Sequence, residues 1–270
     1  MKDLVIKNVS FSYPGDFLAV DDISMEIKAG ENVAIVGQNG AGKSTTVKMM
    51  NGLLKPTKGD VFVGDMNTKD YTTAQISKYV GYVFQNPDDQ IFNATVEAEV
   101  AYGPKYMKLD LEEEKRRVEL ALKITGMDEF RDENPMNLPL SVRKFVTIAA
   151  VIAMDTDIMI FDEPTAGQDI EGNKRLAEIL KKLHEMGKTV ITISHDMEFV
   201  AENFNRVIVM AQKKVVKEGL PEDIFWDFDT LKYAMLHQPY VSRVCRELGV
   251  TKKVIHIDEA VEEIMKLKKD

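Results

Sequence analysis

Short apolar runs separated by turn residues make up the N-terminal part of the chain. Three of them, residues 4–11, 24–27 and 59–63, have the β-rich composition of strands in a partly antiparallel sheet. Residues 32–36 differ, because this run is compact and apolar and a glycine-rich turn follows it. That pattern is typical of a strand buried in a parallel sheet.

The middle of the chain alternates between helical and strand patterns. Residues 111–125 place apolar side chains at helical spacing among charged ones, and residues 140–154 predict a second, more apolar helix. Two buried-strand patterns follow at residues 158–161 and 190–194, with a helical pattern at 171–186 between them. Because a strand, a helix and a strand of these lengths form a βαβ unit, we expect a parallel sheet with helices on its faces. Beyond Pro221 the pattern changes to short helices, and residues 254–268 predict a docked amphipathic helix.

Composition and charge narrow the class of protein. The 270 residues are 44% hydrophobic and 29% charged, as in ordinary globular proteins of one large or two small domains. The formal net charge of −9 argues against a general nucleic-acid binder. Cys245 is the single cysteine, so no disulfide forms within the chain. The longest apolar run, residues 145–154, is too short to span a bilayer as a helix.

A glycine-rich motif follows the apolar run at residues 32–36. It consists of Gly37, Gln38, Asn39, Gly40, Ala41, Gly42, Lys43 and Ser44, and Thr45 comes next. This matches G-x-x-x-x-G-K-S/T in its expected context, after a strand and before a helix. The glycines let backbone N–H groups surround a triphosphate, and Lys43 supplies a positive charge to the β- and γ-phosphates. The Ser44 hydroxyl supplies an oxygen for Mg²⁺, so the motif predicts nucleotide and Mg²⁺ binding.

Two carboxylates end the apolar run at residues 158–161. A strand that ends beside the phosphate loop would bring Asp162 near the metal, where it can hold Mg²⁺ through water. Glu163 follows and is then able to polarise the attacking water, which hydrolysis requires. The structural alternative is that the two acids merely lie at the start of a helix.

Several further residues match the pattern of one nucleotide-binding family. Over roughly residues 1–225 the chain resembles an ATP-binding cassette (ABC) ATPase. The resemblance implies that Tyr13 stacks on adenine, that Gln85 contacts Mg²⁺ and the attacking water, and that His195 lies near the γ-phosphate. Residues 166–169 look like the D-loop, which crosses the dimer interface in that family. The structural alternatives are a half-buried tyrosine, an exposed loop glutamine and a structural histidine.

A narrower resemblance concerns the ATPases of energy-coupling factor (ECF) and cobalt-type importers. Residues 84–90 and 101–104 look like theirs, and residues 239–249 and 257–260 look like their C-terminal extension, which helps to pair two ATPases. The resemblance implies a second ATPase, an integral membrane subunit and a substrate-binding membrane subunit as partners. It also implies import of vitamins or transition-metal ions, driven by ATP at the cytoplasmic face of the membrane. The alternatives are an ATPase of another ABC importer and a soluble ABC ATPase outside transport.

The resemblance also sets the expected architecture. It implies an α/β fold with a RecA-like P-loop core, an antiparallel β-subdomain, a helical subdomain and a small C-terminal extension. The ATP-binding domain is expected over residues 1–220, with its helical subdomain near residues 90–150. Residues 221–270 are expected to form a C-terminal domain that contributes to dimerisation.

The family's signature sequence is altered in this chain. ABC ATPases carry an L-S-G-G-Q segment that caps the γ-phosphate bound on the opposite subunit. Counting back from Asp162 without gaps places Leu138, Pro139, Leu140, Ser141 and Val142 there. Because proline has neither an N–H nor a hydroxyl, Pro139 removes two potential phosphate donors. A register shifted by two residues would instead make Leu140 and Ser141 the L-S pair.

The altered signature predicts an asymmetric pair of ATPases. The phosphate loop and the residues Asp162, Glu163 and His195 are complete, so this chain would pair with a different ATPase whose signature is regular. The site built on Lys43 and the partner's signature would hydrolyse ATP better, and the opposite site would be impaired. The alternative is a homodimer with two mediocre sites.

Overall fold

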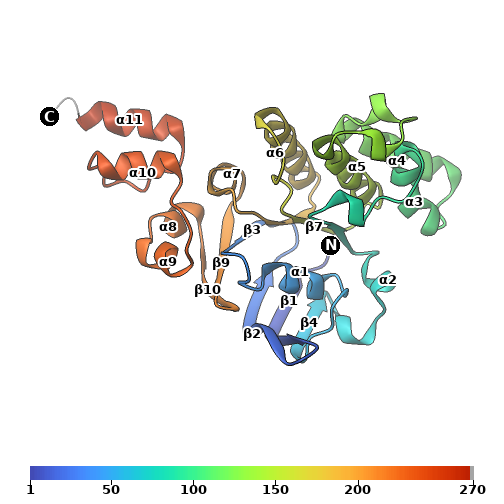
Figure 1. The fold of residues 1–270 in the computed structure, drawn as a ribbon, viewed down its shortest axis with the longest axis horizontal. Coiled ribbons are helices and arrows are strands. Elements are labelled where there is room, and N and C mark those ends of the chain that lie inside the picture. Colours follow the sequence, from blue (N-terminus) through green and yellow to red (C-terminus); the bar gives the residue numbers. More distant parts are fainter. Residues whose placement is uncertain (268–270) are drawn as a thin grey trace.

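The computed structural model describes residues 1–267, and a six-stranded sheet lies at its centre (Figure 1). The strands of this sheet are β3 (Asn32–Val36), β6 (Val80–Val83), β7 (Ile158–Asp162), β8 (Thr189–Ile193), β9 (Arg206–Ala211) and β10 (Lys214–Gly219). Their order is β10-β9-β3-β8-β7-β6. All neighbours pair in parallel except β10, which is antiparallel to β9. The carboxyl ends of the parallel strands therefore meet at one edge.

A second, antiparallel sheet packs against one face of the first. It has the order β2-β1-β4-β5 and contains β1 (Leu4–Tyr13), β2 (Phe17–Ile27), β4 (Lys58–Val63) and β5 (Met66–Asn67). Two helices accompany it, α1 (Lys43–Met50) and α2 (Thr73–Ile76). The side chains of β3 alternate between two cores: Val33 and Ile35 join the core beneath this sheet, whereas Ala34 and Val36 join the core on the other face. Burial on both faces explains the continuous apolar run.

Helices cover the opposite face of the central sheet. They are α3 (Val96–Tyr106), α4 (Leu111–Thr125), α5 (Leu140–Ala153), α6 (Ile170–Glu185) and α7 (Met197–Asn203). The first three pack on one another at one end of the molecule (Figure 1) and form the helical subdomain. Four short 3₁₀ turns, at Thr68–Asp70, Pro87–Asp89, Asp128–Phe130 and Pro135–Asn137, lie in the connections.

The C-terminal segment forms four helices, which are α8 (Pro221–Phe225), α9 (Phe228–Tyr233), α10 (Tyr240–Glu247) and α11 (Ile257–Leu267). Phe225 and Leu231 of the first two belong to the main core. By contrast, α10 and α11 share a small core of their own around Cys245 and Ala260. The helix predicted over residues 254–268 begins three residues later than expected, at Ile257, and its last predicted residue, Lys268, lies outside the described residues.

The predicted fold class is confirmed, with the expected α/β core, antiparallel subdomain and helical subdomain. The main difference is β2, which begins at Phe17 rather than at residue 24. Register shifts in its pairing with β1, between Ile6 and Phe11 and again before Ser12, break the simple alternation of apolar and polar positions. Because of this irregularity, the hydrophobic pattern did not predict the first part of β2.

No helix within residues 1–267 is both long enough and apolar enough to cross a membrane.

Candidate functional site

A cavity of about 560 Å³ lies at the carboxyl edge of the parallel strands. Its lining residues are Asn39, Gly40, Gly42, Lys43, Ser44, Thr45, Gln85, Glu163, Thr165, Ala166, His195 and Asp196. They come from the turn after β3 and from the segments that follow β6, β7 and β8. Because parallel strands end at the same edge, the topology brings together residues far apart in the sequence.

Two glycines give the phosphate loop its shape. Gly37 has φ +153° and Gly42 has φ +100°, a region that other residues rarely adopt. A Cβ atom on Gly37 would lie 2.1 Å from the carbonyl oxygen of Met210, and one on Gly42 would lie 2.7 Å from that of Ala19. The loop therefore requires glycine at both positions, and it leads directly into α1, whose N-terminus favours anions.

Lys43 places its ammonium group against this loop. The side chain is buried, and Nζ donates hydrogen bonds to the carbonyl oxygens of Gly37 at 2.7 Å and Gln38 at 3.1 Å. Burial lowers the pKa of Lys43, and the carboxylates of Glu163 and Asp162 oppose that shift. The ammonium is thus held at the wall of the cavity, where phosphate oxygens can replace the loop carbonyls as acceptors.

Oxygen ligands converge on the predicted metal position. The Ser44 hydroxyl donates to Oδ1 of Asp162 at 3.2 Å, and the Tyr82 hydroxyl donates to Oδ2 at 2.7 Å. Asp162 is buried at the end of β7. A hydroxyl and a carboxylate are hard oxygen donors, and Mg²⁺ completes its shell with water and substrate phosphates. The donor set around Ser44 and Asp162 therefore fits Mg²⁺.

Glu163 and His195 are in direct contact in the wall of the cavity. Oε1 of Glu163 lies 2.9 Å from Nε2 of His195, which is 3.4 Å from Nζ of Lys43. Burial raises the pKa of Glu163, against the effect of the Lys43 charge, and burial also lowers the pKa of His195. Glu163 has φ +52°, in the left-handed region. Strained backbone of this kind is concentrated at functional sites.

The remaining predicted residues surround this centre. Gln85 follows β6 and lines the cavity. Tyr13, at the end of β1, is partly exposed, packs edge-on to Phe11 and shares a hydrogen bond with the hydroxyl of Thr45 at 3.2 Å. The side chain of Ala41 faces the core instead of the cavity. Every other predicted site residue thus lies in the cavity wall or in direct contact with it.

The altered signature lies at the start of α5. Pro139 is the N-cap of this helix and makes no side-chain capping bond. Leu140 is the first helical residue and is half exposed. The backbone N–H of Arg143 donates a hydrogen bond to the carbonyl oxygen of Pro139 at 2.9 Å. This bond closes the first turn of the helix. Pro139 occupies a position that needs no backbone donor, so the helix forms despite the proline.

Three further residues support the site, of which Tyr82 and Lys144 were not predicted and Gln168 lies in the segment 166–169 that resembles the D-loop. Tyr82 holds Asp162 from β6, Lys144 reaches the segment after β7 from α5, and Gln168 bonds to the start of α5. Tyr82 and Lys144 carried a signal in the sequence, since Tyr82 lies within a short apolar strand pattern and Lys144 directly precedes the apolar run at residues 145–154. The predicted helix at residues 140–154 in particular contains one lysine on its buried face.

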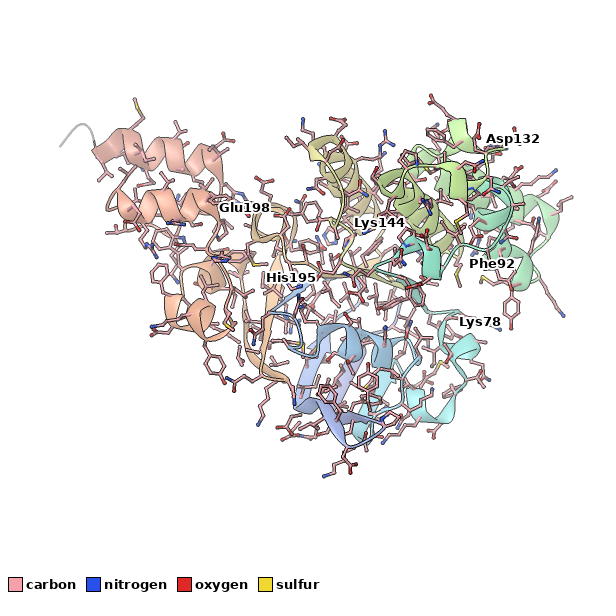
Figure 2. All side chains as sticks on the ribbon, viewed as in Figure 1. Lys78, Phe92, Asp132, Lys144, His195 and Glu198 are labelled. Atoms are coloured by element: carbon pink, nitrogen blue, oxygen red, sulfur yellow. The ribbon has the colours of Figure 1, made fainter. Side chains whose placement is uncertain are left out.

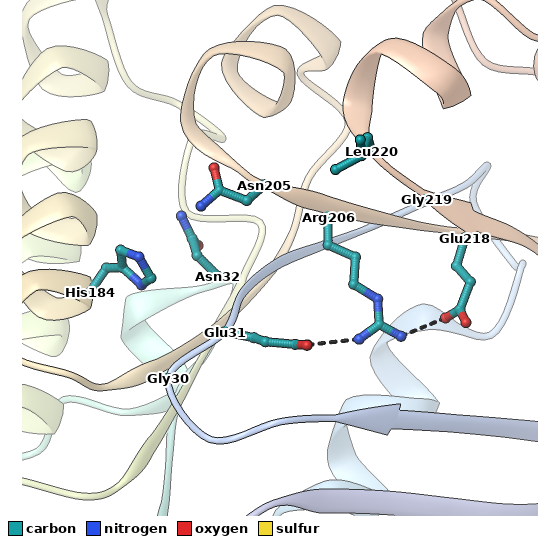
Figure 3. A pocket seen from close by; sticks show the side chains of 9 residues that line it. All are labelled: Gly30, Glu31, Asn32, His184, Asn205, Arg206, Glu218, Gly219 and Leu220. Carbon is teal, nitrogen blue, oxygen red and sulfur yellow. Dashed lines mark hydrogen bonds and ion pairs between the residues drawn. The ribbon is translucent and has the colours of Figure 1, made fainter.

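A second cavity of about 560 Å³ lies at the opposite edge of the sheet, where β3 and β9 begin (Figure 3). Arg206 bridges Glu31 and Glu218 there, with both contacts at 2.7 Å. Its charged groups are paired with one another, so the phosphate-loop cavity near His195 (Figure 2) is the candidate site.

A phosphate loop, a metal-fitting carboxylate and a second carboxylate paired with histidine define a P-loop ATPase of the ABC type. The ABC transporter family matches residues 20–166 of the chain. The energy-coupling factor transporter ATP-binding protein EcfA2 of Clostridium tetani is 37% identical and aligns with 97% of this chain and 96% of its own length. EcfA of Methanocaldococcus jannaschii is 40% identical and aligns with 90% of this chain and 88% of its own.

Solved structures agree with these relatives. The structure of cbiO1 from Clostridium perfringens, described as part of the ABC transporter complex cbiONQ, superposes with a TM-score of 0.76 at 35% identity. It covers 85% of this chain and 92% of that one. A dimeric ATP-binding cassette in a post-hydrolysis state with ADP and Pi matches with a TM-score of 0.73 at 28% identity, covering 81% and 98%.

The chain therefore belongs to the ABC transporter family, with ATP-binding subunits of energy-coupling factor transporters among its full-length relatives. It binds ATP, and its hydrolysis of ATP is coupled to transport.

Proposed function

We propose that this chain powers an ECF-type membrane importer for vitamins or transition-metal ions and works as one half of an ATPase heterodimer. The observation that carries the proposal is the single cavity lined by Lys43, Glu163 and His195, with Asp162 hydrogen-bonded to Ser44 in its wall. The full-length similarity to ECF ATP-binding proteins supports the transporter type.

Different residues of the cavity would bind different parts of the nucleotide. The loop from Gly37 to Thr45 surrounds the phosphates, Lys43 binds the β- and γ-phosphates, and the ring of Tyr13 stacks on adenine. Stacking on a base contributes on the order of 1–3 kcal/mol. The contact between Tyr13 and Thr45 supports this role, because it sets the ring beside the first turn of α1.

Mg²⁺ would be held by Ser44, Asp162 and Gln85. When bound, it neutralises charge on the phosphates during transfer. The hydrogen bond from Tyr82 holds the Asp162 carboxylate in one orientation. Removing the Ser44 hydroxyl would leave Oδ1 of Asp162 without this hydrogen bond, and removing the Asp162 carboxylate would leave the hydroxyl without its acceptor.

Hydrolysis requires a water held in line with the γ-phosphate. Glu163 polarises that water, and its raised pKa favours accepting a proton. His195, in contact with Glu163, orients the carboxylate and lies near the γ-phosphate. Gln85 contacts the water and the metal from the segment after β6.

The pairing surface for a second ATPase is supported by two exposed apolar stripes on the C-terminal helices. The first consists of Tyr240 and Val244 on α10 with Leu248 at its C-cap, and the second of Ile257, Val261 and Met265 on α11, each more than half exposed. Residues spaced by four lie on one face of a helix. A contiguous exposed apolar face of this kind is typical of a protein–protein interface.

The helical subdomain offers a groove for the membrane subunit. A cavity of about 230 Å³ is lined by Leu53, Phe84, Phe92 and Tyr102 among others. The rings of Phe92 and Tyr102 pack edge to face with centroids 4.7 Å apart, and both are about half exposed or more. The groove adjoins the Gln85 segment through Phe84, so a partner seated there would sense the nucleotide. This docking would place the chain peripherally at the cytoplasmic face.

Purification of the tagged native protein in mild detergent, followed by mass spectrometry of its companions, tests the proposal. A second ATPase together with an integral membrane protein is the expected result, and the smallest membrane companion would indicate the transported substrate. Recovery of this chain alone and self-paired would contradict both the heterodimer and the transporter assembly.

A further inference from the structure

Lys144 is a buried charged residue that nucleotide binding does not use. It lies on α5, is 3% exposed, and is labelled in Figure 2. Its Nζ donates hydrogen bonds to the carbonyl oxygen of Glu163 and to that of Ala166, each at 3.0 Å. Burying an ammonium group without hydrogen bonds costs free energy, so the two carbonyl acceptors stabilise Lys144 in this position.

The first acceptor belongs to the residue whose side chain faces His195. Glu163 has φ +52°, a conformation that costs free energy in a residue with a Cβ atom. Its backbone N–H donates to the carbonyl oxygen of Ile193 at 3.0 Å, and its backbone carbonyl accepts from Lys144. Both polar groups of the Glu163 backbone are thus fixed, and with them the direction in which its side chain leaves the backbone.

A second contact ties the same two segments. Nε2 of Gln168 donates to the carbonyl oxygen of Ser141 at 3.0 Å. Ser141 belongs to the first turn of α5, the turn that carries the altered signature. The segment after β7 and the start of α5 are therefore joined at both ends, by Lys144 and by Gln168.

We propose that Lys144 is a positioning residue for hydrolysis, which holds the strained backbone of Glu163 and ties it to the first turn of α5. The inference rests on the proposed role of Glu163. A displacement of about 1 Å at a catalytic group can cost on the order of a hundredfold in rate. Loss of the two hydrogen bonds therefore acts on kcat and leaves ATP binding through Lys43 in place.

The test compares Lys144→Met with a matched control in the purified ATPase complex. Lys188 is the control, because it is also largely buried and donates to a backbone carbonyl, that of Asp155, at the opposite edge of the sheet. We expect Lys144→Met to lower kcat roughly tenfold or more with KM for ATP changed less than about threefold. Lys188→Met is expected to lower Tm without changing kcat.

Lys144→Arg and Lys144→Gln keep side-chain donors, and at least one of them is expected to recover most of kcat. A kcat within about twofold of the parent for Lys144→Met would overturn the inference, as would failure of both donor variants to recover it. A parallel loss of ATP affinity would also overturn it, since the role would then be general support of the fold. Glu163→Gln is measured alongside: normal turnover there contradicts the proposed function, whereas arrest there with normal Lys144→Met contradicts only the role of Lys144.

Discussion

At the scale of single residues, the site is built from buried charged groups. Lys43, Asp162 and Glu163 are all buried, and each has an opposite charge or a hydrogen-bond donor nearby. An unpaired buried charge is strongly destabilising, so these groups depend on one another. Substitutions here separate binding from hydrolysis.

Lys43→Ala should weaken ATP binding by roughly tenfold to a hundredfold, because hydrogen bonds to charged groups contribute about 1.5–3 kcal/mol. Equilibrium titration with a fluorescent ATP analogue measures the change. Lys48→Ala, in the last turn of the same helix, is the control and should bind normally. Unchanged affinity in Lys43→Ala would remove Lys43 from the phosphate site.

Glu163 also predicts a pH-dependent stability. Its raised folded-state pKa, caused by burial and opposed by Lys43 and Lys144, means that folding favours the protonated form. The stability that this form contributes is complete below the ordinary value near 4.5 and is lost as pH rises through the folded pKa. Glu163→Gln, which stays neutral, should therefore raise Tm more at pH 8 than at pH 5. An equal Tm difference at both values would contradict this.

At the scale of elements, α5 links the altered signature to the backbone of Glu163. Its first turn begins after Pro139 and its second carries Lys144 against the Glu163 carbonyl. In the proposed pair of ATPases, a change at the start of this helix would therefore affect two sites, one on each subunit.

The double substitution Pro139→Ser and Ser141→Gly should raise ATP hydrolysis by the complex about fivefold. One recovered hydrogen bond contributes about 1 kcal/mol, and serine at an N-cap also stabilises the helix. Pro139→Ala with Ser141→Gly restores the backbone N–H without the hydroxyl and should give a smaller gain. Steady-state phosphate release measures both, and no gain in either would show that the signature does not limit turnover.

Part of the fold and of the candidate site could be predicted from the sequence patterns of single elements. The strand at Asn32–Val36 and the motif after it follow from burial and phosphate chemistry, and both lie where expected. Tyr82 and Lys144 were missed because their partners, Asp162 and the Glu163 carbonyl, lie about 80 and 19 residues away in sequence. Local periodicity carries no information on such contacts.

At the scale of the whole molecule, the chain presents two separate surfaces in addition to the cavity proposed to bind ATP. Helices α10 and α11 lie at one end of the molecule and α3, α4 and α5 at the other (Figure 1). The exposed apolar stripes belong to the first pair of helices, and the groove is lined in part by residues of α3 and α5. ATP that contacts both subunits only in the closed pair would shift the population toward closure. Hydrolysis of ATP, with Glu163 as the proposed base, would then allow the pair to reopen.

The most direct measurement is ATP turnover together with bound nucleotide in a purified complex that carries Glu163→Gln on this chain alone. The account predicts that the complex retains ATP while hydrolysis at this site falls by roughly a hundredfold or more, as expected on loss of a general base. Turnover equal to that of the parent complex would contradict the assignment of Glu163, and with it the proposed mechanism of this cavity.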